Sequence, residues 1–109
     1  MSIRQIILSK GKSVIIKRMS QDAGNAYTST YNQIGTEKMY IEPQSAGDAV
    51  ISDGLVGQIF LGFSTEDADI KSGDQVIDGE TIYVIDGIEV FDSIGLNKHK
   101  EATMRKMSN

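Results

Sequence analysis

The stretch from Ser72 to Asp92, SGDQVIDGETIYVIDGIEVFD, constrains the fold most strongly, because apolar and polar residues alternate along it. Alternation with a period of two is typical of a strand that buries one face. The dipeptide Asp-Gly occurs at Asp78-Gly79 and at Asp86-Gly87. It favours the type I′ turn of a two-residue hairpin, which we expect across Asp78-Gly79. The strands expected are those around Val76, over residues 81–85 and over residues 88–91.

Four further segments have the β-branched and aromatic composition of strands. They are residues 13–19, 26–35, 38–43 and 58–64. Between the first two, Asp22, Gly24 and Asn25 are residues that favour turns, so Gly24–Asn25 is interpreted as the hinge of a hairpin. Pro43 cannot donate a ladder hydrogen bond, and we expect it to end its strand or to lie at a sheet edge.

The chain has 109 residues, which is enough for one domain with one modest core. About six or seven short strands with little convincing helix predict an all-β barrel or sandwich. We favour a small antiparallel β-barrel, SH3-like or OB-like, because closure removes exposed sheet edges. An N-terminal extension is expected over residues 1–12 and a single barrel domain over residues 13–109. Residues 2–8 fit one short amphipathic turn or a frayed strand, and residues 98–106 fit either strand or helix.

Residues 45–57, SAGDAVISDGLVG, interrupt the strand pattern with three glycines, small side chains and weak alternation. Loops of this length inside a compact domain are usually functional or disordered. We therefore expect a long, mobile central loop here.

Charge is segregated along the chain, although the net charge is only −4. Residues 1–18 carry five basic side chains and no acid, residues 66–92 carry nine acids and one lysine, and residues 98–106 carry four bases and one acid. The basic ends and the acidic middle could pair within one fold, or between neighbouring copies of it. The sequence leaves both alternatives open.

Residues suited to catalysis or metal binding are sparse. There is no cysteine, His99 is the only histidine, and no phosphate-binding glycine motif occurs. The acidic cluster of Glu66, Asp67, Asp69 and Asp74 lacks the ligand spacing of an EF-hand, so a solvated acidic turn is the simpler interpretation. We expect no enzyme activity, no cofactor and no metal site. No signal peptide and no membrane-spanning stretch is expected either.

The four tyrosines could stack on nucleic-acid bases, as in other small barrels. An acidic domain with a pI of about 4.8 repels phosphates, however, and core or rim packing is the commoner role for tyrosine.

The order of the segments resembles the head–tail joining proteins of tailed phages, the head-completion or stopper family. The matching pieces, in chain order, are residues 15–18 (IIKR), 22–25 (DAGN), 42–43 (EP), 70–87 (IKSGDQVIDGETIYVIDG) and 99–106 (HKEATMRK). The resemblance covers about residues 13–106. The first dozen residues are additional to the usual start of the family.

This resemblance implies a structural virion protein that forms a ring, typically of twelve subunits, beneath the portal and its adaptor. Such a head–tail connector retains packaged double-stranded DNA and offers a docking surface to tail proteins. It would lie in the virion neck, after assembly in the host cytoplasm, with no membrane partner. The alternatives are a tail-completion or tail-terminator protein, and a small barrel module that binds nucleic acid or peptide.

Three groups of residues take expected roles under this resemblance. In the family, the central loop can line or plug the channel, and the residues at the corresponding positions are Ser45, Gly47, Asp48, Asp53, Gly54 and Gly57. The charge pattern predicts two complementary faces between subunits, because a ring needs unlike faces. The acidic face comprises Glu66, Asp67, Asp69 and Asp74. The basic face comprises Lys98, Lys100, Arg105 and Lys106.

Overall fold

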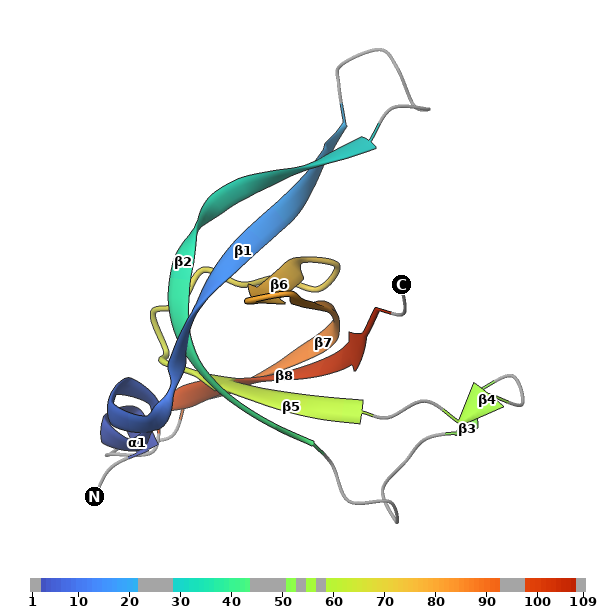
Figure 1. The fold of residues 1–109 in the computed structure, drawn as a ribbon. Helices are drawn as coiled ribbons and strands as arrows, with labels where there is room; N and C mark the ends of the chain where they lie inside the picture. Colours follow the sequence, from blue (N-terminus) through green and yellow to red (C-terminus); the bar gives the residue numbers. More distant parts are fainter. Residues whose placement is uncertain are drawn as a thin grey trace.

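The protein is a closed antiparallel β-barrel of six strands, which confirms the predicted all-β class (Figure 1). The computed structural model describes residues 3–21, 29–43, 51–52, 55–56, 59–92 and 98–107. The strands follow one another around the barrel as β1 (Lys12–Gln21), β2 (Ser29–Pro43), β5 (Ile59–Ser64), β8 (His99–Lys106), β7 (Thr81–Phe91) and β6 (Gln75–Asp78). A separate two-stranded sheet joins β3 (Ile51–Ser52) to β4 (Leu55–Val56), and one helix, α1 (Ile3–Lys10), precedes the barrel.

Strand β2 is one continuous element of 15 residues, where the sequence suggested two strands. It pairs with β1 through its first part and with β5 only through residues 39–43. The expected hairpin between β1 and β2 is confirmed by their antiparallel register, and its hinge, Gly24–Asn25, lies outside the described residues. Pro43 ends β2, as predicted. Residues 99–106 form a strand, which decides between the two alternatives for the C-terminal segment.

The Asp-Gly dipeptides at residues 78–79 and 86–87 have different roles. Asp78 pairs with Thr81, so the turn residues between β6 and β7 are Gly79 and Glu80, one position later than predicted. Gly79 has a φ of 61°, which a side chain would strain. Asp86 forms no turn at all. The register with β8 shifts between Ile85 and Gly87, so Asp86 is the extra residue of a bulge in one continuous strand.

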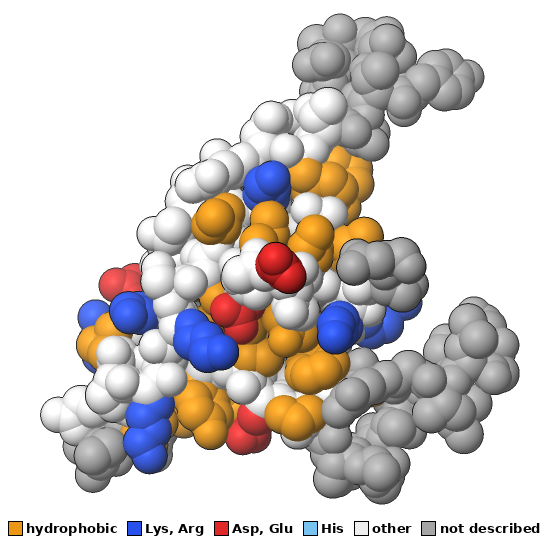
Figure 2. All heavy atoms as spheres, in the orientation of Figure 1, with side chains coloured by type: hydrophobic (Ala, Val, Ile, Leu, Met, Phe, Trp, Pro, Cys, Tyr) orange, Lys and Arg blue, Asp and Glu red, His pale blue; other side chains and the backbone are white. Residues whose placement is uncertain are grey.

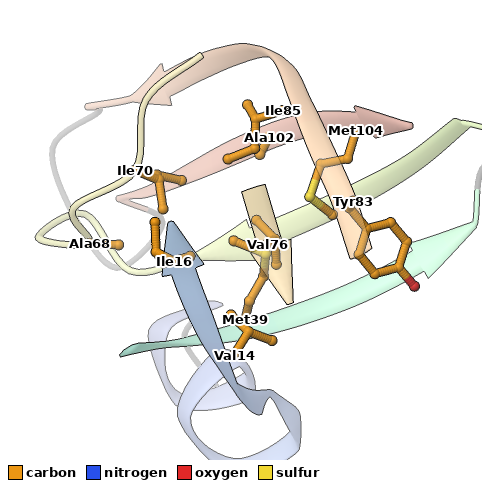
Figure 3. Close-up of a cluster of buried hydrophobic side chains, with 10 residues drawn as sticks. All are labelled: Val14, Ile16, Met39, Ala68, Ile70, Val76, Tyr83, Ile85, Ala102 and Met104. Carbon is orange, nitrogen blue, oxygen red and sulfur yellow. The ribbon is translucent and has the colours of Figure 1, made fainter. Parts of the chain in front are cut away.

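The core is a thin aliphatic cluster inside the barrel (Figure 3). Its fully buried side chains come from every strand of the barrel except β5. Strand β5 contributes Gly62 instead, whose missing side chain leaves room in the core. A Cβ at this position would lie 2.6 Å from the Met39 sulfur. Met39 and Met104 occupy that space, as expected of methionine in a thin core. The members of the cluster are Val14, Ile16, Met39, Ala68, Ile70, Val76, Tyr83, Ile85, Ala102 and Met104.

Helix α1 packs on the barrel against β2 and β5. Its Ile7 is fully buried but lies outside the barrel cluster, so the helix adds a second, smaller apolar contact. Of the two alternatives for residues 2–8, the helical one is therefore observed and the frayed strand is not. Gly11 follows it directly and donates a hydrogen bond to the Ile7 carbonyl at 2.8 Å, and a Cβ at this position would clash with that same oxygen.

Strands β1 and β2 extend beyond the barrel as a two-stranded arm (Figure 1). On the side away from β2, strand β1 pairs with β6, but only through residues 15–17. We use the name arm for residues 18–21 of β1 with residues 29–32 of β2. The arm consists of paired backbone with no third strand on either side among the described residues.

Candidate interaction surfaces

The acidic turn between β5 and β6, residues 65–74, closes one end of the barrel. Ala68 and Ile70 are 2% and 5% exposed, and both side chains point into the core cluster (Figure 3). The turn was expected to be a solvated loop. Three of its four acids are exposed, as expected, but the turn is also a lid with an apolar underside.

Asp74 is the buried acid of this lid, and Arg18 at the base of the arm binds it. Arg18 donates from Nε and Nη2 to the two carboxylate oxygens at 3.0 and 2.9 Å. The backbone amide of Lys71 donates to the same carboxylate at 2.9 Å. The Asp74 side chain is 2% exposed, so its carboxylate does not lie at the surface as the predicted acidic face requires. Bonding to Asp74 raises the pKa of Arg18 above its ordinary range.

The other acids of the turn lie at the surface. Asp69 accepts a second hydrogen bond from Arg18 Nη2, at 3.0 Å, and is 64% exposed. Asp67 accepts a 2.6 Å hydrogen bond from the Thr65 hydroxyl and lies 3.6 Å from Arg4 of helix α1. The Thr65 hydroxyl, with smaller help from Arg4, lowers the pKa of Asp67. Glu66 is exposed and makes no ion pair with any residue in the described ranges.

The predicted basic face lies on and beside β8, and three of its four members contact partners in the same chain. Arg105 donates from Nε and Nη2 to Asp86 at 2.7 and 2.9 Å, across the bulge of β7. Lys100 donates to the Ala68 carbonyl of the acidic turn at 2.7 Å, and Lys98 lies 3.8 Å from Asp92. Lys106 is exposed.

Pairing within one fold is therefore observed for most of the segregated charges. The basic ends of the chain meet acids of the 66–92 segment in four pairs besides those of Arg18, which join Arg4 to Asp67, Lys12 to Asp78, Lys98 to Asp92 and Arg105 to Asp86. On the face shown in Figure 2, basic and acidic side chains are interspersed around hydrophobic ones, with no separate field of either sign. Contacts between copies through these charges remain a prediction.

The expected channel loop falls mainly outside the described residues. Ser45, Gly47, Asp48, Asp53, Gly54 and Gly57 are not among them. The described parts of the 45–57 segment are β3 and β4, whose antiparallel register joins Ile51 to Val56 and Ser52 to Leu55. Part of the segment is therefore a short hairpin.

A row of rings crosses the outer surface of four neighbouring strands, a feature that sequence reasoning missed. Tyr40 of β2 lies 6.2 Å from Phe63 of β5, and Phe63 lies 6.1 Å from His99 of β8. His99 stacks flat on Phe91 of β7 at 4.6 Å and shares a 2.8 Å hydrogen bond with Glu101. His99 is 6% exposed, so it is a packed residue of this row.

The barrel end opposite the acidic lid opens into a cavity of about 310 Å³. Its wall is mainly apolar and aromatic, and a 3.7 Å ion pair between Lys12 and Asp78 lies at its rim. Tyr83 is 7% exposed and packs edge-on against Phe60 at 5.1 Å, in the core role expected for tyrosine. The lining residues are Lys10, Lys12, Met39, Tyr40, Ile41, Pro43, Phe60, Asp78 and Tyr83.

Within the described ranges, no group of three or more His, Cys, Asp or Glu side chains is arranged to hold a metal ion. Among the same residues, no helix has the length and apolar character to cross a bilayer. No protein-family model matches the chain, and no curated protein matches it.

Proposed function

We propose that this chain is a structural subunit of the neck of a tailed virus. In this role, copies form a ring beneath the portal or its adaptor, retain the packaged DNA and offer a docking surface to the tail. The proposal starts from the order of sequence motifs shared with head-completion proteins. A small all-β barrel is the fold which that resemblance implied.

The observation that carries the proposal is the asymmetry of the subunit. A closed barrel forms the body, and the arm extends from one side of it (Figure 1). A ring is built from heterologous contacts, so each subunit needs two unlike surfaces that fit each other. A barrel body with a projecting two-stranded arm can supply such a pair.

The charges contribute less to this proposal than the sequence suggested. Arg18, Lys98 and Arg105 already have carboxylate partners in their own chain. A neighbouring copy that used these groups would have to compete with the existing pairs, and exposed ion pairs stabilise by no more than about 1 kcal/mol each. Assembly is therefore expected to depend more on shape and strand contacts than on salt.

The direct test is co-expression with the portal and adaptor proteins of the same viral genome, followed by affinity purification on the portal and electron microscopy. We expect a ring of this chain on the portal–adaptor complex. A ring on a tail tube alone would favour the tail-terminator alternative. A monomer that ignores both complexes and binds oligonucleotides in a salt-sensitive manner would refute the connector and favour a nucleic-acid-binding module.

A further inference from the structure

Several stretches of strand edge have no neighbour among the described residues, and two of them could join copies of the chain. The first, called the β2 edge, is the side of residues 29–36 that faces away from β1. Strand β5 reaches β2 only from Met39 onward, and no backbone hydrogen bond from a described residue reaches the edge. An open edge presents a row of amide and carbonyl groups that can pair with another strand.

The β2 edge lacks the usual protection against such pairing. Its sequence, STYNQIGT, contains no charged residue and no proline over eight positions. Exposed edges normally carry lysine, proline or inward-pointing charges, because these block the approach of another chain. The one irregularity is Ile34, the extra residue of a bulge opposite Ile16 and Lys17, and its side chain is 40% exposed.

The second open edge, called the β7 edge, is the side of residues 87–91 that faces away from β8. Strand β6 pairs with residues 81–84 of β7, and two backbone bonds to Gly73 and Asp74 extend that contact no further than Ile85. Val90 in this edge is 58% exposed, the largest value among the exposed large hydrophobic side chains of the described residues. Glu89 beside it is also exposed.

We propose that the β7 edge of one copy pairs with the β2 edge of the next, so that the sheets of successive copies join. The closure of successive copies into a ring rests on the proposed function. The strand pairing itself is inferred from the two edges alone. The pairing would cover Val90 of one copy and Ile34 on the β2 edge of the other, which are 58% and 40% exposed.

Charge favours this pairing over the two symmetric alternatives. Strand β1, which flanks the β2 edge, carries Lys17 opposite Gln33 and contains no acid over its ten residues. The β7 edge carries the exposed Glu89, whereas Asp92 after it is already paired with Lys98 of its own chain. Pairing of a β7 edge with a β2 edge therefore brings opposite charges together. Pairing of two β7 edges would instead bring Glu89 of one copy close to Glu89 of the other. Two β2 edges would gain no such attraction.

Cysteine cross-linking tests the pairing cleanly, because the natural chain has no cysteine. Gln33→Cys and Val90→Cys change one exposed residue on each edge. The double variant, treated with a short bismaleimide at high protein concentration and again on the portal–adaptor complex, should give a ladder of covalent multimers. Each single variant should give none. The matched control is Gln33→Cys with Glu80→Cys, which places the second thiol in the exposed turn at the opposite end of β7 from the β7 edge.

The outcomes separate this inference from the proposed function. Rings on the portal without cross-linking between positions 33 and 90 would overturn the edge pairing and leave the connector role intact. Cross-linked multimers that never bind a portal would support the edge pairing and contradict the connector role. Covalent dimers from Gln33→Cys alone, or from Val90→Cys alone, would mean symmetric pairing and overturn the proposal, as would the absence of any multimer in both settings.

A second measurement needs no cross-linker. Gln33→Lys places on the β2 edge the charge that natural edges use as protection. Self-association measured by sedimentation should weaken about tenfold or more, a loss of roughly 1.4 kcal/mol. Glu80→Gln changes the net charge by the same amount at the opposite end of β7 and should leave association unchanged. Equal behaviour of the two variants would contradict the pairing.

Discussion

The barrel and the arm are made from the same two strands, yet different forces stabilise them. Inside the barrel, Val14 and Ile16 of β1 are fully buried. Past Lys17 the same strand carries Met19, which is 47% exposed, and its partner β2 has no further neighbour there among the described residues. The barrel is held by apolar burial, whereas the arm is held by backbone pairing and by the contact of Arg18 with the acidic lid.

This difference shows where a partner would contribute most. A two-stranded ribbon is marginally stable in water, and a third strand gives such a ribbon a surface against which to pack. The arm thus has more to gain from pairing with another chain than any part of the barrel. Besides the continuity of its two strands with the barrel, the arm contacts the lid through Arg18, which binds the buried carboxylate of Asp74 and the exposed one of Asp69.

The largest effect is expected from shortening a methionine in the barrel. Met104 is fully buried and packs in the core beside Gly62, so Met104→Ala should lower the free energy of unfolding by about 2 to 5 kcal/mol. Met19→Ala makes the same chemical change in the arm, where it should cost less than about 1 kcal/mol. Denaturant unfolding of both variants measures the contrast. Similar losses would mean that the arm buries as much apolar surface as the barrel.

A second comparison uses the two carboxylates that share Arg18. Asp74→Asn leaves the guanidinium without its buried counter-charge and should cost about 2 to 3 kcal/mol, below the full value for a buried pair because Arg18 is 26% exposed. Asp69→Asn removes only an exposed partner and should cost less than about 1 kcal/mol.

Hydrogen exchange gives this pair of variants a second readout. Asp74→Asn should also speed amide exchange in residues 18–21 and 29–32, because the base of the arm loses its attachment. Asp69→Asn should leave that exchange close to the natural rate. If neither variant changed exchange in the arm, Arg18 would be a stabiliser of the lid and not the link between lid and arm.

The fold class could be predicted from the sequence because alternation and turn residues are local signals. The stretch from Ser72 to Asp92 contains both strands and their turn, and no distant contact was needed to recognise them. The strand register was harder to predict from the sequence. Whether an Asp-Gly pair makes a turn or a bulge depends on the strand across from it, which is why Gly79 lies in a turn and Asp86 in a bulge.

The candidate surfaces were less predictable, because they depend on which distant residues meet. Sequence reasoning placed Asp74 on an acidic surface with its neighbours, and only the fold brings Arg18, 56 positions away, against it. The row of rings from Tyr40 to Phe91 depends in the same way on the strand order β2, β5, β8, β7. The uncharged run of the β2 edge was visible in the sequence, but its meaning required the observation that no strand lies beside it.

The smallest effect concerns Asp67, whose environment lies within the lid and does not involve the arm. The 2.6 Å hydrogen bond from Thr65 holds the pKa of Asp67 below its ordinary value, so the bond stabilises the fold above about pH 4 and is lost as the pH falls through the lowered pKa. Thr65→Val should raise the pKa of Asp67 in a carboxyl NMR titration and make stability fall less steeply in acid. Arg4→Gln removes the weaker, exposed contribution at 3.6 Å and should shift the pKa less. An unchanged pKa of Asp67 in Thr65→Val would mean that the Thr65 hydroxyl does not stabilise the ionised carboxylate.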